Sequence, residues 1–239
     1  MPISVTNSAP SAQDIQQLFD RIAPVYDDFN QQLSGGLHRV WKQMAVDWSG
    51  AASGQTGLDV CCGSGDLALL LARRVGPSGE VYGVDFSPAQ LAIARQKPAQ
   101  PSRLAPLHWI EGDALTLPFE DEQFDAATMA YGLRNLTNLT QGLKELRRVL
   151  RPGAKAAILD FLQPQSAWLQ QFQRWYLDTI VVPTAKNFGM TDEYAYIGPS
   201  VERFPLGPEQ QQLALEAGFA SAVHYPIAGG LMGILVLTR

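Results

Sequence analysis

The fold of this chain is decided by one stretch, Gly57-Leu58-Asp59-Val60-Cys61-Cys62-Gly63-Ser64-Gly65-Asp66-Leu67-Ala68. It predicts a short buried strand, a tight glycine turn and the first turn of a helix. Gly63 and Gly65 lack the Cβ atoms that would keep a ligand away from the backbone, and the unpaired N–H groups of the helix start would face that ligand. The spacing Gly63-x-Gly65-x-x-Ala68 is typical of nucleotide-binding turns in doubly wound α/β folds. A glycine turn that only packs a helix on a strand has the same spacing, so the rest of the chain must decide.

The composition is that of a folded, mildly acidic protein. The chain has 239 residues, which fits one α/β domain; 46% are hydrophobic and the formal net charge is −5. No run of basic residues occurs, which argues against nucleic acid as a partner. Cys61 and Cys62 are adjacent and there are three histidines, so neither a disulfide framework nor a metal site is predicted.

The chain carries no signal for export or for crossing a membrane. Its start is polar and contains prolines, unlike a secretory signal. The longest clearly apolar run, residues 231–237, is too short to span a bilayer and predicts a buried strand instead. We therefore expect a cytoplasmic protein.

Strand and helix patterns alternate through most of the chain. Strands are predicted at 58–61, 80–85, 107–111, 124–130 and 156–161, then at 223–226 and 232–238 after a helix at 208–217. Such alternation predicts an α/β fold with a parallel sheet covered by helices on both faces.

Two helices are predicted before the first strand. Ser11 and Asp14 offer a capping box for the first, and Pro24 ends it. Residues 26–30 and 34–36 are predicted as loop. The second helix carries an apolar face of Leu37, Val40, Trp41, Met44 and Trp48. With no strand partners, the two helices are expected to cover one edge of the sheet.

An aromatic-rich segment interrupts the alternation after the fifth strand. Within it, Trp168, Phe172 and Trp175 recur at helical spacing. This stripe predicts either ordinary core or an apolar lid over a hydrophobic substrate.

Acidic residues lie at the ends of three predicted strands, where open parallel sheets bind their ligands. Asp85 ends the second strand about 20 residues after Gly65, the distance at which an acid reaches ribose hydroxyls, and Phe86 follows it. Asp113 follows the third strand and Asp160 ends the fifth. Because carboxylates are rarely buried without partners, these strand ends predict a binding site.

Two more acids, Asp59 and Asp66, flank the glycine turn. They would repel the pyrophosphate of a dinucleotide, whereas S-adenosylmethionine is cationic and has no phosphate. In that interpretation Asp85 holds the ribose diol, and Asp113 accepts from the adenine N6 amino group while the N–H of Ala114 faces the ring. Asp59 is expected to hold the turn or a bridging water rather than to touch the ligand.

Three further motifs carry a resemblance to a known family. They are Tyr26-Asp27-x-x-Asn30-x-x-Leu33-Ser34-x-x-x-His38-x-x-Trp41, Gly132-Leu133-Arg134-Asn135 and Arg148-Val149-Leu150-Arg151-Pro152-Gly153. They resemble the signatures of the ubiquinone/menaquinone biosynthesis C-methyltransferases, and the glycine turn resembles motif one of class I S-adenosylmethionine-dependent methyltransferases. The similarity runs from about Phe19 to the C-terminus.

The chain departs from the family's pattern at a few positions. Phe29 stands where Met is usual, and a glycine, a glutamate and a serine near the last motif are replaced by Ala154, Asp160 and Leu162. The Cys-Cys-Gly-Ser-Gly-Asp form of the turn is similar to the cyanobacterial and plastid branch, whose product is phylloquinone.

The resemblance implies a Rossmann-like class I methyltransferase fold, with a seven-stranded, mostly parallel sheet. We expect a single domain, with a tail at 1–10, N-terminal cover helices at 11–50, a cofactor-binding core at 56–163 and 204–239, and an aromatic-rich, substrate-side insertion at 164–203.

The resemblance also implies S-adenosylmethionine as the cofactor. The family's contacts fall on Ser64, Asp85, Asp113 and Ala114, with Ala130 where a serine is usual, and Tyr26 closes over the methionine part. Together with the turn and the second strand end, the binding candidates are Tyr26, Asp59, Gly63, Ser64, Gly65, Asp85, Phe86, Asp113, Ala114 and Ala130.

The implied reaction is methylation of a ring carbon of a demethylated prenyl-naphthoquinol. Demethylphylloquinone is the expected substrate, and demethylmenaquinone or a ubiquinone precursor is the alternative. Arg134 and Asn135 are the catalytic candidates: the permanently cationic Arg134 stabilises the phenolate, or orients a water with Asn135. His38 and Asp160 are alternative bases, and a structural ion pair is the alternative role for Arg134.

Three expectations about other classes and partners complete the sequence reading. A NAD-dependent oxidoreductase and a non-catalytic S-adenosylmethionine-binding scaffold stay open as rival classes. The lipophilic quinol is the expected partner, and it suggests peripheral membrane contact through residues 161–204. The oligomeric state is not predicted.

Overall fold

A computed structural model describes residues 10–97, 104–186 and 188–239. The predicted tail therefore lies almost entirely outside the described residues. The strands are β1 Thr56–Val60, β2 Glu80–Asp85, β3 Leu107–Glu111, β4 Phe124–Ala130, β5 Leu150–Phe161, β6 Ser221–Ile227 and β7 Met232–Thr238. The helices are α1 Ala12–Ile22, α2 Tyr26–Ser34, α3 Leu37–Trp48, α4 Asp66–Val75, α5 Pro88–Gln96, α6 Leu139–Val149, α7 Ala167–Tyr176, α8 Val182–Lys186, α9 Thr191–Ala195, α10 Ile197–Arg203 and α11 Gly207–Glu216.

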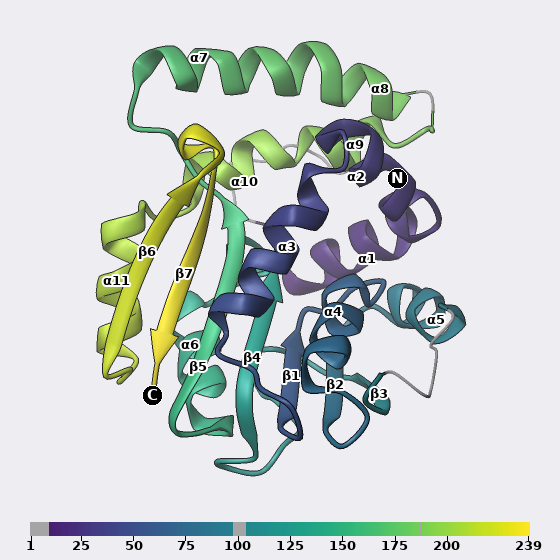
Figure 1. Ribbon diagram of the computed structural model, residues 1–239. Helices are drawn as coiled ribbons and strands as arrows, with labels where there is room; N and C mark the ends of the chain where they lie inside the picture. The colour runs from purple at the N-terminus through teal and green to yellow at the C-terminus, as the bar shows by residue number, and fades with distance from the viewer. Residues whose placement is uncertain (1–9, 98–103, 187) are drawn as a thin grey trace.

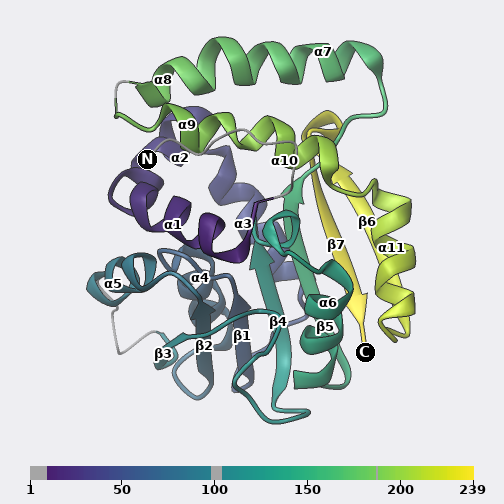
Figure 2. The ribbon, with the colours of Figure 1, turned by 180° about the vertical axis from the view of Figure 1, so that it is seen from behind.

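The seven strands form one sheet in the order β3-β2-β1-β4-β5-β7-β6. β7 runs antiparallel to both of its neighbours, and the other pairs are parallel. The seven-stranded, mostly parallel sheet is thus confirmed. Figure 1 shows the parallel strands pointing toward the end of the sheet that α7 crosses, with α3 and α4 in front, and Figure 2 shows α6 and α11 on the opposite face.

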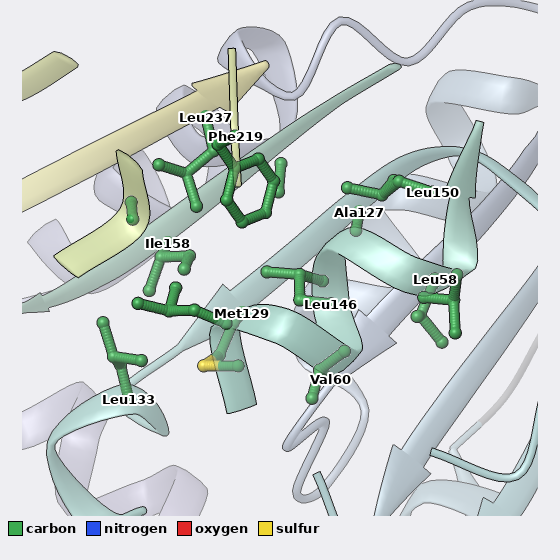
Figure 3. Close-up of a cluster of buried hydrophobic side chains, with 14 of the residues drawn as sticks. Leu58, Val60, Ala127, Met129, Leu133, Leu146, Leu150, Ile158, Phe219 and Leu237 are labelled. Atoms are coloured by element: carbon green, nitrogen blue, oxygen red, sulfur yellow. The ribbon is translucent and has the colours of Figure 1, made fainter. Parts of the chain in front are cut away.

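The core lies between the sheet and the helices on its faces. Figure 3 shows side chains of β1, β4 and β5 meeting those of α6 and β7, among them Leu58, Met129, Ile158, Leu146 and Leu237. Each of these is at most 2% exposed. Strands buried on both faces appear in the sequence as nearly continuous apolar runs, which is why most strands were predictable.

β5 is longer than predicted, because it begins at Leu150 and not at residue 156. Leu150 pairs with Phe124, and the register then shifts so that Lys155 pairs with Ala126. Pro152 and Gly153 therefore lie at an irregularity within the strand.

The N-terminal segment confirms the first helix and corrects the loop after it. Ser11 accepts from the Asp14 N–H at 3.2 Å while Asp14 accepts from the Ser11 N–H at 2.9 Å, which completes the predicted capping box. The loop predicted at 26–30 is wrong, because these residues begin helix α2. Phe29 is fully buried and its ring centroid lies 3.9 Å from that of Tyr194, so packing overrides the polar composition of the segment.

α3 confirms the predicted helix and part of its apolar face, since Trp41, Met44 and Trp48 are half-buried against the core, but the most buried residues lie on an adjacent face. Its buried residues are His38, Lys42, Ala45 and Val46, whereas Leu37 and Val40 are 54% and 55% exposed. The expectation that it covers an edge is also wrong, since Ala45 packs against β5 on a face of the sheet.

Residues 164–203 contribute α7 to α10, which lie with α1 and α2 over the carboxyl ends of the strands (Figures 1 and 2). Ile22, Phe29, Leu177 and Tyr194 belong to one buried cluster, so the insertion and the N-terminal helices share a core. The aromatic stripe of α7 is not part of it: Trp168 is 69% exposed and Trp175 53%. This exposure rules out the ordinary-core interpretation of the stripe.

Candidate functional site

The ends of β1, β2 and β4 enclose a cavity of about 70 Å³, here called the strand-end cavity. Gly63 has a φ of +52°, and a Cβ added to it would meet only the Gln90 Oε1, at 3.7 Å, so the turn leaves open space beside the backbone. Seven of the ten predicted cofactor residues line this cavity: Tyr26, Gly63, Asp85, Phe86, Asp113, Ala114 and Ala130. The structure thus brings together residues from α2, from the ends of β2 and β4, and from the loops after β1 and β3.

Asp85 is the most constrained residue of the strand-end cavity. Its two carboxylate oxygens accept from the N–H groups of Gly63 and Ser87, both at 2.8 Å. The side chain is buried, and this burial raises the pKa of Asp85 to about 6. Each oxygen can accept a second hydrogen bond, so the pair suits a ligand with two adjacent hydroxyls.

Asp113 and Asn135 provide further acceptors around the same cavity. Asp113 is exposed, and one of its oxygens accepts from the Leu115 N–H at 2.9 Å. Asn135 donates to the Tyr131 carbonyl at 2.8 Å, while its Oδ1 is buried with no hydrogen-bond partner among the described residues. Buried acceptors normally accept a hydrogen bond, so the unpaired Oδ1 of Asn135 indicates that this cavity binds a ligand with a hydrogen-bond donor.

A second, small cavity of about 20 Å³ adjoins the glycine turn and is called the turn cavity. Asp59 lines it and is fully buried; one oxygen accepts from Thr128 Oγ1 at 2.9 Å, and the other has no partner among the residues described. Burial raises the pKa of Asp59 to about 7. An unpaired buried carboxylate oxygen favours a cationic ligand group.

Lys42 also lines the turn cavity, and sequence reasoning missed it. Its side chain is buried, and the ammonium lies 3.0 Å from Asp66 Oδ2. The sequence did carry a signal for this residue, namely a lysine within the apolar pattern of α3. Lysines are rarely buried without a partner, so a buried lysine there indicates a charged group nearby.

Two residues of the turn are placed differently from the expectation. The Ser64 hydroxyl donates to Asp27 Oδ1 at 2.6 Å and lines only the turn cavity. Gly65 lines neither cavity; a Cβ there would come within 2.5 Å of the Trp109 ring, so this glycine is needed for packing.

A third and larger cavity of about 470 Å³ lies between the N-terminal helices and the insertion. It is called the apolar cavity, and side chains such as Leu18, Ile22, Trp41, Phe172, Tyr176 and Leu231 line it. Its wall is mostly apolar, with a few polar groups that include Arg134 and His38. Cavities of this kind bind lipophilic molecules and orient them through the few polar groups.

Arg134 is the buried cation of the apolar cavity. Its Nη1 donates to Asp160 Oδ1 at 2.6 Å and to the Tyr131 carbonyl at 2.8 Å, and its Nε is buried without a partner in the described part of the chain. Asp160 also accepts from the N–H groups of Arg134 and Phe161. These bonds occupy Asp160 as the anchor of Arg134, which disfavours it as a base.

The two catalytic candidates of the sequence therefore face different cavities. Arg134 lines the apolar cavity, whereas Asn135 lines the strand-end cavity. Both side chains donate to the Tyr131 carbonyl, so this carbonyl joins them although they line different cavities.

Tyr26 and Tyr131 line all three cavities and so mark the place where they meet. Tyr131 has a φ of +61°, an uncommon conformation for a residue with a bulky side chain. Burial raises the pKa of Tyr26 to about 12 and that of Tyr131 still higher, so both phenols stay protonated. The sequence offered no signal for Tyr131, because a strained backbone angle cannot be read from residue types.

Comparison with known proteins identifies the family. The family model described as the ubiE/COQ5 methyltransferase family matches residues 7–238. The chain belongs to this family. It is therefore an S-adenosylmethionine-dependent methyltransferase, as the acids around the turn and the N-terminal signature led us to expect.

Curated relatives match this methyltransferase over nearly its full length. A 2-phytyl-1,4-naphtoquinone methyltransferase of Trichormus variabilis is 58% identical over 95% of this chain and 99% of the relative. The Synechocystis protein with the same name is 58% identical over 96% and 97%, and the chloroplastic 2-phytyl-1,4-beta-naphthoquinone methyltransferase of Arabidopsis thaliana is 51% identical over 93% and 86%.

Solved structures support the class I methyltransferase fold. A SAM-dependent methyltransferase from Aquifex aeolicus superimposes with a TM-score of 0.61 at 21% identity, covering 82% of this chain and 88% of the other. A putative S-adenosyl-L-methionine-dependent methyltransferase from Methanococcus maripaludis gives 0.64 at 18% identity, covering 99% and 97%. At these identities the likeness concerns the fold alone.

The residues of the site fit the cofactor of this methyltransferase. Asp85 could accept from the two ribose hydroxyls, and Asn135 or Asp113 from the adenine amino group. In the turn cavity, the free oxygen of Asp59 could accept from the α-ammonium group, and Lys42 could pair with the α-carboxylate. When bound, the cofactor supplies an electrophilic methyl group on a positively charged sulfur.

Proposed function

We propose that this methyltransferase methylates a ring carbon of a demethylated prenyl-naphthoquinol, with the reduced form of demethylphylloquinone as its substrate. The observation that carries the proposal is the apolar cavity, which meets the strand-end cavity at Tyr26 and Tyr131 and holds Arg134 in its wall. A lipophilic ring lying there would be next to the cofactor. The names of the relatives from Trichormus variabilis, Synechocystis and Arabidopsis thaliana support the naphthoquinone class.

The reduced ring is required by the chemistry of the methyl group. A quinone carbon is electrophilic, whereas a quinol carbon beside a hydroxyl is electron-rich and becomes more so when that hydroxyl loses its proton. Arg134 Nε–H can then donate to the developing phenolate, because it has no other partner among the described residues. Asp160 and the Tyr131 carbonyl hold the guanidinium in place before the reaction. Holding ring and cofactor in contact supplies much of the remaining acceleration.

For the cofactor we propose the residues that the sequence predicts, with three changes to the set and one to a role: Asp59, expected to hold the turn or a bridging water, would contact the α-ammonium group. Lys42 is added at the methionine end and Asn135 at the adenine end. Gly65 is assigned to packing beneath the turn, as its contact with Trp109 supports.

Methyl transfer to a defined quinol tests this function. Incubated with methyl-labelled S-adenosylmethionine, the protein should label reduced 2-phytyl-1,4-naphthoquinone on its ring and leave the oxidised form unlabelled. A demethylmenaquinol and a demethylated ubiquinol precursor, offered in parallel, report the preference for ring and tail. Binding of the cofactor without label transfer to any of these quinols would contradict the enzyme proposal and favour the scaffold.

We further propose that the protein docks on the membrane that dissolves its substrate. None of the helices within the described ranges is long and apolar enough to cross a bilayer. Trp168, Phe172 and Trp175 of α7 form an exposed aromatic face, with ring centroids 5.9 and 5.8 Å apart along the row. Phe172 and the exposed Leu37 also line the apolar cavity, so this face is continuous with the cavity rim. Tryptophan is favoured at the lipid headgroup level.

The double variant Trp168→Ser/Trp175→Ser tests the docking. Losing two partly buried indoles at the interface should weaken binding to phosphatidylcholine/phosphatidylglycerol vesicles by about tenfold or more in a sedimentation assay. Turnover of a detergent-dispersed, short-tailed quinol should stay unchanged, since neither indole lines the cavity. The control Leu215→Ser/Val223→Ser removes two other exposed apolar side chains, which lie on α11 and β6. Equal vesicle binding by wild type and the tryptophan variant would contradict the proposal.

A further inference from the structure

The hydrogen bonds of Ser34 define the tautomer of His38. The Ser34 hydroxyl lies 2.7 Å from the Asn30 carbonyl and 2.6 Å from His38 Nδ1. A carbonyl only accepts, so the one hydroxyl hydrogen is directed to Asn30. Ser34 Oγ must then accept from His38, which places a hydrogen on Nδ1 and leaves the lone pair on Nε2.

His38 belongs to the wall of the apolar cavity. The residue is 5% exposed, and it lines the cavity together with Arg134 and Tyr131. Within the described ranges, Nε2 has no hydrogen-bond partner. Burial lowers the pKa of His38; Lys42 and Arg39 on α3 lower it further, while Asp66 on α4 and Asp27 on α2 raise it. The imidazole is therefore neutral at pH 7.

The other ionisable groups of the cavity wall are poor proton acceptors. Arg134 is permanently cationic, and Glu193 is ion-paired with Arg21 at 2.7 Å. Burial raises the pKa of Tyr26, Tyr131 and Tyr194, so these phenols keep their protons.

We propose that His38 Nε2 is the general base that takes the quinol hydroxyl proton, and that Ser34 positions it. This inference rests on the proposed function. The O–H electron pair stays on the quinol oxygen and is delocalised to the neighbouring ring carbon. That carbon forms a bond to the methyl carbon as the methyl–sulfur bond breaks, with its electron pair left on sulfur. The ring carbon then loses its hydrogen to water, and His38 returns its proton to the oxygen, so one proton is released per methyl transferred.

The tautomer can be tested without any turnover. The chain has three histidines, so the imidazole ¹⁵N–¹H spectrum of the protein alone is assignable from single variants. His38 should be neutral at pH 7.5 with the hydrogen on Nδ1, and Ser34→Ala should shift it toward a mixture of tautomers. A His38 that is charged, or that carries its hydrogen on Nε2, would overturn the proposal.

The catalytic role is tested by His38→Asn, which keeps a donor near the Nδ1 position and removes Nε2. We expect turnover to fall by about 100- to 1,000-fold with unchanged affinity for S-adenosylmethionine. The wild-type rate should fall at low pH, where the imidazole loses its lone pair, and the variant should lack this decline. Ser34→Thr keeps the hydroxyl and should retain activity, whereas Ser34→Ala should lose part of it.

His224→Asn is the matched control, because His224 is a partly buried histidine of β6 outside the three cavities. Its pH profile should match that of wild type. Full activity in His38→Asn, with the decline at low pH intact, would overturn the role of His38. Absence of methyl transfer by the wild-type protein would instead contradict the proposed function and leave the tautomer measurement standing.

Discussion

Asp85→Ala should abolish useful binding of S-adenosylmethionine, with an affinity loss of at least about 100-fold in calorimetry. The two oxygens of Asp85 already accept from the N–H groups of Gly63 and Ser87, and each retains capacity for one ribose hydroxyl. Hydrogen bonds to a charged group contribute about 1.5–3 kcal/mol each, and about 1.4 kcal/mol changes an affinity tenfold. Losing two such bonds therefore exceeds 100-fold.

The variant also leaves two backbone N–H groups unpaired, so its stability must be measured alongside its affinity. Asp125→Ala is the matched control. Asp125 accepts from the Thr56 N–H at 2.9 Å and pairs with Arg151 at the opposite end of the sheet. It should lose stability without losing affinity for the cofactor. If the affinity of Asp85→Ala stays within a few-fold of wild type while it remains folded, Asp85 does not hold the ribose.

The same residue predicts how cofactor affinity depends on pH. Burial raises the pKa of Asp85 to about 6 in the protein without ligand. The ionised carboxylate accepts from both hydroxyls, whereas protonation turns one acceptor into a donor. Affinity should therefore be retained above about pH 6 and decline below it.

Most of the sheet was predictable, because its central strands are buried on both faces and the outer strands keep recognisable strand patterns. Glu80–Asp85, Leu107–Glu111, Phe124–Ala130 and Met232–Thr238 have the bounds that the apolar runs predict. The chain around them follows local rules: the Ser87 side chain caps α5, and Pro88 stands at the first position of this helix. Where local pattern and tertiary packing agree, the sequence alone is sufficient.

The errors lie where two distant segments pack on each other. Residues 26–30 look like a loop because four of them are polar or aromatic hydrogen-bonding groups, but Phe29 is buried against Tyr194 from the insertion. The face of α3 was partly misjudged for the same reason. Leu37, which lines the apolar cavity, and Val40 are exposed, while His38 and Lys42 are buried and line the apolar cavity and the turn cavity.

Open parallel sheets bind their ligands at the carboxyl ends of their strands, and this strand-end rule selected candidates of which most line one cavity. Their roles in binding the cofactor stay predictions. The rule names the residue at which each strand ends and says nothing of groups that reach the site from elsewhere. Lys42 arrives from a helix that precedes the first strand, and Tyr131 depends on a backbone angle. The rule also could not separate Arg134 from Asn135, which are adjacent in sequence and face different cavities.

Arg134→Lys should lower turnover by about 100- to 1,000-fold while leaving cofactor affinity unchanged. Lysine keeps the positive charge and can still pair with Asp160, so no buried carboxylate is left alone. It lacks the guanidinium N–H groups other than the one that binds Asp160 and the Tyr131 carbonyl, among them the buried Nε–H, which has no partner in the described residues. Removing one donor that stabilises a developing oxyanion typically costs this much in rate. Steady-state methyl transfer with a reduced naphthoquinol measures the loss.

Arg148→Lys serves as the control, because Arg148 pairs with Glu145 and Asp121 away from the three cavities and should affect turnover little. Near-normal turnover of Arg134→Lys would mean that the ion pair with Asp160 is the whole role of Arg134.

The pH profile of the methyl-transfer rate separates the role of Arg134 from that of His38. Arginine does not titrate in proteins, so its loss should lower the rate by the same factor between about pH 6 and 9. Loss of His38 should instead change the shape of the profile, because only the imidazole gains and loses a proton in this range.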